Sequence, residues 1–226
     1  MPPTQREDAA IASGDATLRG DLVIPERARG VVLFAHGSGS GRRSPRNRYV
    51  AELLQSRGLG TLLLDLLMEE EERLDAGTGH LRFDIDLLAK RVVSATEWVT
   101  SAGEAEGLRV GYFGASTGAA AALQAATCTE ICAVVSRGGR PDLALEHLSK
   151  VKAPTLLIVG GNDIPVIPLN QRAHDELRCT RELVIVPDAG HLFEESGMLD
   201  IVASLAGDWF LRYLSLDEEA THRTAS

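Results

Sequence analysis

Apolar residues along this chain gather in short runs that are separated by longer amphipathic segments. The runs VVLFA, TLLLDL and TLLIV are almost entirely apolar. Such runs are typical of strands that are buried on both faces, as in parallel sheets. The pattern predicts strands at residues 17–24, 31–35, 61–66, 109–113, 133–136, 155–159 and 183–186.

The segments between these runs carry apolar residues at helical spacing, and they predict helices at residues 45–57, 82–100, 117–126, 168–177 and 198–214. Strand–helix alternation with short connections predicts an α/β fold, with a mostly parallel, twisted sheet and helices on both faces. We find no internal repeat and no long linker, so residues 1–226 are predicted to form a single domain. Residues 1–15 and 216–226 are expected to be flexible tails.

The segment RVGYFGASTGAAAAL has the most informative chemistry, because it predicts a strand, a sharp turn and a helix of small residues. Its centre, Gly114-Ala115-Ser116-Thr117-Gly118, matches G-x-S-x-G, the pattern of a nucleophile elbow. The glycines allow the strand and helix to approach closely, and the turn exposes the Ser116 hydroxyl. The helix N-terminus favours a developing negative charge. We therefore predict that Ser116 is a nucleophile.

A serine hydroxyl needs a general base at neutral pH, and the base needs an acid to orient it. His191 follows the last predicted strand on a glycine-containing loop, and Asp163 follows the strand TLLIV. The order Ser116, Asp163, His191 is that of the α/β-hydrolases. Asp188, three residues before His191, is an alternative orienting acid.

A second glycine-rich loop follows the strand VVLFA and is predicted to hold an oxyanion. Acyl transfer needs backbone N–H donors for the tetrahedral intermediate. The expected donors are the amides of Thr117 and Ser38, with Gly37 as the substitute for Ser38. His36 is expected to hold this loop by hydrogen bonding. The loop lacks the spacing and the lysine of a phosphate-binding loop, so nucleotide binding is not expected.

Charge and composition narrow the class of protein further. The formal net charge is −9, which disfavours general binding to nucleic acids or anionic membranes. The N-terminal segment has no apolar core of a signal peptide, and no apolar run is long enough to span a bilayer, so a cytoplasmic protein is expected. The three cysteines have neither a disulfide pattern nor metal-site spacing, and we expect neither a metal nor an organic cofactor.

Arginines are concentrated after the glycine loop, at Arg42, Arg43, Arg46 and Arg48. They are either a solvated cluster paired with acidic neighbours or a fork for a substrate carboxylate or phosphate. Arg42, Arg43 and Arg137 are the candidate substrate contacts, and Arg137 follows another strand in SRGGRP. The acidic run at residues 69–72 is predicted to be a mobile surface loop beside the site.

These motifs make the sequence resemble small α/β-hydrolases of the dienelactone hydrolase-like group. The resemblance covers about residues 18–214 and includes the blocks HGSGSGRRSPRNR, RFDIDLLAKR, GASTGAAAAL, VVSRGGRPDLA, APTLLIVGGND and AGHLFEE. It implies an α/β-hydrolase fold without a large lid domain. Related bacterial hydrolases are sometimes fused to a phosphoribosyltransferase domain, which nothing in this sequence matches. Dienelactone hydrolases proper have a cysteine at the elbow, whereas this chain has Ser116.

The serine favours a carboxylesterase that acts on a small-molecule ester through an acyl-enzyme intermediate. A thioesterase, a dienelactone or lactone hydrolase, and a peptidase remain alternatives with the same three residues. A non-catalytic binding protein with a hydrolase fold is the alternative from another class. The expected assembly is a monomer or a homodimer.

Overall fold

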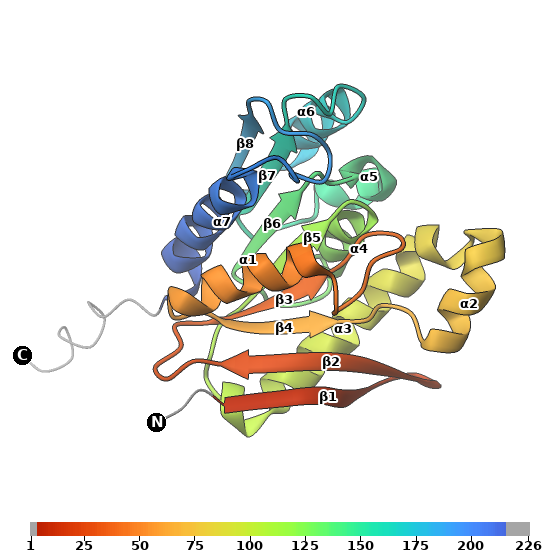
Figure 1. Ribbon diagram of the computed structural model, residues 1–226, viewed down its shortest axis with the longest axis vertical. Helices are drawn as coiled ribbons and strands as arrows, with labels where there is room; N and C mark the ends of the chain where they lie inside the picture. The colour runs from red at the N-terminus through yellow and green to blue at the C-terminus, as the bar shows by residue number, and fades with distance from the viewer. Residues whose placement is uncertain (1–3, 216–226) are drawn as a thin grey trace, which may run out of the picture.

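The computed structural model describes residues 4–215, and its centre is one sheet of eight strands in the order β1-β2-β4-β3-β5-β6-β7-β8 (Figure 1). All neighbouring strands from β4 to β8 pair in parallel, while β1 and β2 add an antiparallel hairpin at one edge. The predicted α/β architecture with a mostly parallel sheet is therefore confirmed. The strands are β1 Thr4–Ser13, β2 Ala16–Ile24, β3 Val31–Ala35, β4 Gly60–Leu64, β5 Val110–Ala115, β6 Ala133–Arg137, β7 Thr155–Gly160 and β8 Arg181–Val186.

Helices cover both faces of the sheet (Figure 1). Helices α1 and α7 pack together on one face, and α3 and α4 pack together on the other. No inserted lid domain interrupts the alternation of strands and helices within residues 4–215. The α-helices are α1 Pro45–Ser56, α2 Glu69–Thr78, α3 Ile85–Ser101, α4 Thr117–Ala125, α5 Leu145–Leu148, α6 Ile167–Glu176 and α7 Met198–Leu214.

The N-terminal segment is a strand, so the prediction of a flexible tail at residues 1–15 is wrong for most of that segment. Strand β1 pairs with β2 on both sides of an irregularity between Arg6 and Ala9, and it packs against α3. Its inward side chains at Ala9 and Ile11 are buried, whereas most of its other residues are exposed. The second predicted tail, at residues 216–226, lies outside the described residues.

The acidic run at residues 69–72 begins helix α2 and is not the loop that the sequence predicted. The Met68 N–H donates to the Glu71 carboxylate at 2.8 Å, which closes the first turn. Four glutamates in this turn also lie at the positive end of the helix dipole. The helix ends at Gly79, whose φ of 65° is left-handed.

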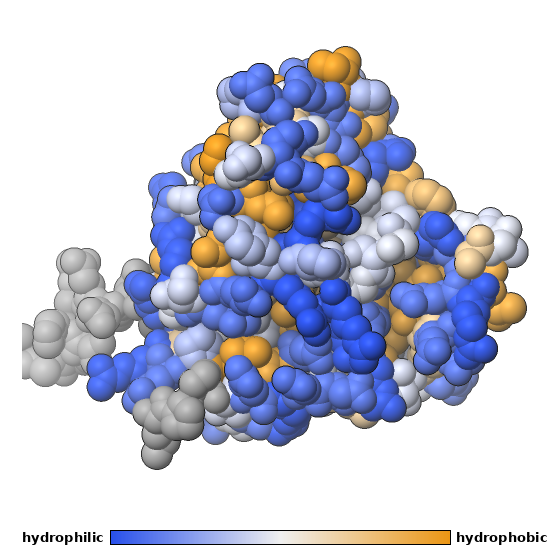
Figure 2. Space-filling model, in the orientation of Figure 1, coloured by the Kyte–Doolittle hydropathy of each residue, from blue (hydrophilic) through white to orange (hydrophobic). Residues whose placement is uncertain are grey.

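The carboxyl ends of strands β3 to β8 meet along one edge of the sheet, because these strands are parallel. The loops that carry the sequence-predicted site residues follow β3, β5, β6, β7 and β8. The sheet therefore gathers segments that are up to about 150 residues apart in the sequence at one edge. The face of the molecule shown in Figure 2 is largely hydrophilic, with apolar side chains scattered over it.

Candidate active site

Ser116 lies at a sharp turn between β5 and α4, with φ 50° and ψ −122°. This backbone conformation is rare for a residue with a side chain, and it is the kind of strain that a nucleophile elbow requires. A Cβ on Gly114 would lie 2.4 Å from Ala119 Cα, and one on Gly118 would lie 2.2 Å from the Ala35 carbonyl oxygen. The spacing of the motif thus follows from the close contact of strand and helix. The turn leaves Ser116 half-buried and accessible.

His191 lies on the loop after β8, and its Nδ1 is 2.7 Å from Asp163 Oδ2. Asp163 is buried, whereas His191 is partly exposed. A neutral imidazole that donates from Nδ1 to this carboxylate leaves Nε2 as an acceptor. The structure thus joins these two residues across 28 positions of sequence. The alternative acid Asp188 lies on the same loop at φ 61° and is exposed, while Asp163 occupies the Nδ1 side of the ring.

Gly138 shows that His191 lies close to the serine turn. A Cβ on Gly138 would be 2.9 Å from the His191 carbonyl oxygen and 3.5 Å from its Nδ1. The preceding residue, Arg137, accepts a hydrogen bond from the Ser116 N–H at 3.3 Å. The hydrogen bonds within residues 4–215 do not include one from Ser116 Oγ to His191. Catalytic hydrogen bonds are often long before substrate binds.

His36 fixes the loop after β3, as expected from the sequence. Its Nδ1 lies 2.9 Å from the Gly37 carbonyl oxygen, and the Leu66 N–H donates to its Nε2 at 2.8 Å. One nitrogen must donate and the other must accept, so the ring is neutral. Burial lowers the pKa of His36, which favours this neutral form. The ring connects the loops that follow β3 and β4.

The predicted oxyanion donors lie against the serine turn, but one of them already has a partner. The Ser38 N–H donates to Thr117 Oγ1 at 3.1 Å, and the Ser38 and Thr117 hydroxyls are also 3.1 Å apart. An oxyanion that accepted from the Ser38 amide would therefore have to replace the Thr117 hydroxyl. The Thr117 N–H is at the first position of α4, where the helix offers it no acceptor. The alternative donor, Gly37, lies against Ser116, since a Cβ on it would be 2.9 Å from Ser116 Cβ.

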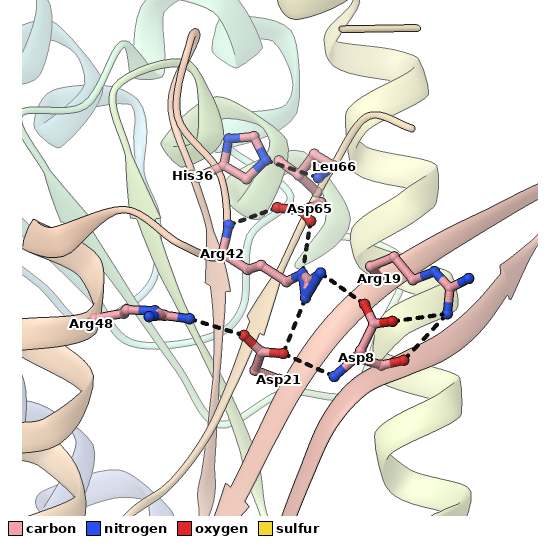
Figure 3. A network of polar contacts seen from close by, with 8 residues as sticks. All are labelled: Asp8, Arg19, Asp21, His36, Arg42, Arg48, Asp65 and Leu66. Carbon is pink, nitrogen blue, oxygen red and sulfur yellow. Dashed lines mark hydrogen bonds and ion pairs between the residues drawn. The ribbon is translucent and has the colours of Figure 1, made fainter. Parts of the chain in front are cut away.

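Arg42 is paired with acidic neighbours, as in the first interpretation of the arginine cluster, and it also borders the cavity described below, so its role as a substrate contact stays a prediction. It is buried, and its guanidinium contacts three carboxylates (Figure 3). Nε is 2.9 Å from Asp65 Oδ2, Nη1 is 3.2 Å from Asp21, and Nη2 is 2.7 Å from Asp8. The Arg42 N–H also donates to Asp65 at 2.7 Å. The sequence did not indicate Asp65, because its role depends on the contact between two loops.

A cavity of about 920 Å³ opens beside these loops, and Ser38 and Thr117 lie at its border. Further walls come from the loop after β4, where Leu67 and Met68 supply apolar surface, and from α2, β2 and the start of α1. This volume is within the range of pockets that bind small molecules. Arg43 is exposed and lines the cavity, so its role as a substrate contact stays a prediction.

Arg137, the remaining predicted substrate contact, is buried at the carboxyl end of β6. Burial, together with the nearby charge of Arg46, lowers the pKa of Arg137 to about 10. Its Nε and Nη1 atoms are buried and have no hydrogen-bond partner.

The three cysteines, Cys128, Cys132 and Cys179, are free thiols. Within residues 4–215, no three His, Cys, Asp or Glu side chains gather as a metal-binding group. In the same part of the chain, every helix is too short or too polar to cross a membrane.

Comparison with known structures agrees with this architecture. A crystal structure of dienelactone hydrolase from Anabaena variabilis is 58% identical, with a TM-score of 0.91 over 95% of this chain and 100% of its own. An esterase from Pyrococcus furiosus is 20% identical but shares the fold, with a TM-score of 0.78 over 94% of each chain.

A curated relative from Mycobacterium tuberculosis, provisionally named a phosphoribosyl transferase, is 53% identical over 215 residues. The match covers 94% of this chain but 48% of the relative, so the chain spans about half the length of that protein. The family model described as the dienelactone hydrolase family matches residues 18–220. The chain therefore belongs to the dienelactone hydrolase family and has the α/β fold of these structural neighbours.

Proposed function

We propose that this protein is a serine hydrolase that cleaves carboxylic esters through Ser116, His191 and Asp163. His191 Nε2 takes the Ser116 proton as Oγ attacks the ester carbonyl carbon, and it returns that proton to the leaving alcohol. Water then attacks the acyl-enzyme with His191 again as general base. Asp163 holds the ring through Nδ1 and stabilises the imidazolium that forms in each step.

Backbone amides stabilise the negative charge that develops on the carbonyl oxygen. In this proposal the donors are the N–H groups of Thr117 and Ser38, because Thr117 follows Ser116 in the turn and Ser38 contacts Thr117. The Ser38 donor becomes available when the Thr117 hydroxyl turns away from it. Each such donor contributes about 3 kcal/mol to stabilisation of the transition state.

The observation that supports the proposal best is the 2.7 Å contact between His191 and Asp163 at the edge that also presents the strained Ser116 turn. The three side chains come from loops after β5, β7 and β8, and a strained turn has no structural reason to face an oriented histidine. Cleavage of a lactone, which is a cyclic ester, is the second candidate. The name of the Anabaena variabilis protein, dienelactone hydrolase, favours it.

The test is substitution of the nucleophile. Ser116→Ala should lower kcat for 4-nitrophenyl acetate by at least about 10³-fold, because the covalent route is lost. A fluorophosphonate probe should label Ser116 of the unmodified protein, and mass spectrometry of the labelled peptide should locate it. Ser101→Ala, on an exposed residue at the end of α3, is the matched control and should keep both activity and labelling. Labelling at another residue, or full activity in Ser116→Ala, would contradict the proposal.

A further inference from the structure

The end of β6 and the three residues after it, here called the β6 loop (residues 137–140), hold the Ser116 turn from both sides. The Ser116 N–H donates to the Arg137 carbonyl oxygen at 3.3 Å, and the Ser116 carbonyl oxygen accepts the Arg140 N–H at 3.0 Å. Ser116 has a φ of 50°, and such a conformation persists only where the surrounding structure imposes it. The β6 loop therefore helps to fix the direction in which the Ser116 side chain projects.

The β6 loop also lies against the histidine. A Cβ on Gly138 would be 2.9 Å from the His191 carbonyl oxygen and 3.5 Å from its Nδ1, the atom that faces Asp163. Gly138 has a φ of 50°, which glycine adopts without strain. Because the loop contacts both the serine turn and the imidazole, a displacement of the loop would change the alignment of Ser116 with His191.

One buried side chain connects the β6 loop to helix α6. Asn170 is completely buried, and its Nδ2 donates to the Gly139 carbonyl oxygen at 3.0 Å. The same Nδ2 donates to the Val166 carbonyl oxygen at 3.0 Å, one helical turn earlier. Both neighbours are acceptors, so the amide must present its NH2 group to them. Within residues 4–215, Asn170 is the one side chain of another element that forms a hydrogen bond with the β6 loop.

Helix α6 begins directly after the acid that orients His191. The N–H groups of Val166 and Ile167 donate to the Asp163 carbonyl oxygen at 3.0 Å and 3.3 Å. The Asn170 amide therefore bonds to the helix turn that adjoins Asp163 and to the loop that holds the serine turn. It joins the acid segment to the nucleophile segment through two backbone carbonyl groups.

Packing alone does not account for an asparagine at this position. Asn170 Oδ1 is buried without a hydrogen-bond partner, which lowers stability because the oxygen has lost its water. Ala173, the next fully buried residue of α6, is apolar, and an apolar side chain at position 170 would avoid this loss. What the asparagine supplies, and an apolar residue cannot, is the donor to Gly139.

We propose that Asn170 is a positioning residue, whose amide fixes the β6 loop and thereby the alignment of Ser116 with His191. The kinetic part of this inference rests on the proposed function. Asn170 contacts no reacting atom, and the side chains that line the cavity beside Ser38 and Thr117 come from elements other than α6 and the β6 loop. Loss of the amide should therefore slow proton transfer between serine and histidine and leave substrate binding in place.

Kinetics separates positioning from binding. Asn170→Leu keeps a side chain of similar size and removes the donor. It should lower kcat for 4-nitrophenyl acetate by about tenfold or more, with KM within about threefold of the wild-type value. Labelling of Ser116 by a fluorophosphonate should slow by a similar factor, because it uses the same serine and histidine. Equal kcat in Asn170→Leu and the wild type would overturn the proposal.

A matched control separates positioning from a general weakening of α6. Ala173→Gly weakens the same helix at a buried position but removes no hydrogen bond to the β6 loop. It should keep kcat within about twofold of the wild type, since only the helix propensity changes. If Ala173→Gly lowered kcat as much as Asn170→Leu does, the effect would come from the stability of α6, and the proposal would be wrong.

Amide hydrogen exchange measures the connection without any need for activity. In Asn170→Leu the N–H groups of Ser116 and Arg140 should exchange faster than in the wild type, because both are bonded across the β6 loop. Amides in the middle of β5 should keep their protection, and Ala173→Gly should not single out Ser116 and Arg140. Unchanged exchange at these two amides, or faster exchange throughout the protein, would contradict the proposal.

A second variant covers the case in which leucine does not fit the site. Asn170→Ala removes the same donor with a smaller side chain and should show the same local exchange and the same fall in kcat. If Ser116 and Arg140 exchange faster in both variants although the wild type cleaves no ester, the proposed ester hydrolysis fails while the connection through Asn170 stands. If the wild type cleaves esters through Ser116 and both variants keep its kcat, the hydrolysis stands and the positioning role is wrong.

Discussion

His36 shows how a single buried side chain shapes the loop next to Ser116. Its Nδ1 contacts the Gly37 carbonyl oxygen, and its Nε2 accepts the Leu66 N–H. The carbonyl oxygen and the N–H of one trans peptide point in opposite directions. A fixed Gly37 carbonyl therefore directs the Ser38 N–H the other way, to the Thr117 hydroxyl beside Ser116. Protonation of His36 would remove the acceptor for Leu66 and loosen this arrangement.

Because His36 is neutral in the folded protein, we predict that the unfolding free energy decreases in acid. Because the folded-state pKa is lowered from 6.5, the unfolded chain binds this proton at a higher pH than the folded chain. The contribution is fully present above about pH 6.5 and is lost as the pH falls toward the lower folded-state pKa. In this pH window the wild type should lose more unfolding free energy than the His36→Gln variant does. The difference should be up to about 1.4 kcal/mol per pH unit. Urea unfolding at pH 7.5 and 5.5 measures this difference, and parallel curves for the two proteins would refute it.

Residues in local motifs could be predicted from the sequence, whereas residues defined by packing could not. Ser116 was predictable because its turn imposes glycines at fixed neighbouring positions. The three carboxylate partners of Arg42 could not be predicted, because they belong to β1, β2 and the loop after β4. The hydroxyl of Thr117 was missed as a partner of Ser38, since a hydrogen bond between two separate loops leaves no pattern in either loop.

At the level of the element, the sequence analysis predicted a loop where α2 begins and a flexible tail where β1 lies. Each of these two errors has a physical cause. Helix α2 has few apolar residues and contains a glycine near its end, so its amphipathic pattern is weak. Its first turn is fixed instead by Glu71, which accepts from Met68 and from the buried Arg91. Burial alone would raise the pKa of Glu71, but the hydrogen bonds from Arg91 and Met68 outweigh this effect and lower it. Strand β1 was missed because as an edge strand it buries few side chains.

Glu71→Gln should destabilise the protein by about 2 kcal/mol, because it leaves the buried Arg91 guanidinium without its carboxylate. Glu70→Gln is the matched control on the same helix turn, where Glu70 pairs with Arg73 and both side chains are exposed. The control should change stability by no more than about 0.5 kcal/mol. Urea unfolding at pH 7 measures both variants. Equal effects would mean that the Arg91 contact adds no more than a surface ion pair.

At the scale of the whole molecule, Arg42 joins the antiparallel hairpin to the parallel sheet and to the loop at the candidate site. Asp8 lies on β1, Asp21 on β2 and Asp65 after β4, and each of them contacts the same guanidinium (Figure 3). Arg48 and Arg19 extend the network at 3.6 Å from Asp21 and 3.4 Å from Asp8. The hairpin thereby supports the segment that carries Ser38, although it lies at the opposite edge of the sheet from β8, the strand that precedes His191.

Arg42→Met is expected to destabilise the protein by about 3 kcal/mol, because three neighbouring carboxylates lose their common cation. Repulsion among these carboxylates is partly screened by salt, so 1 M sodium chloride should recover part of the loss. Arg43→Met removes the same charge one residue away, from an exposed side chain, and should stay within about 0.5 kcal/mol of the wild type. Thermal and urea unfolding at both salt concentrations compare the three proteins. If Arg42→Met matched Arg43→Met in both conditions, the hairpin would be held by its strand pairing alone, and Arg42 would again be free to serve as a substrate contact.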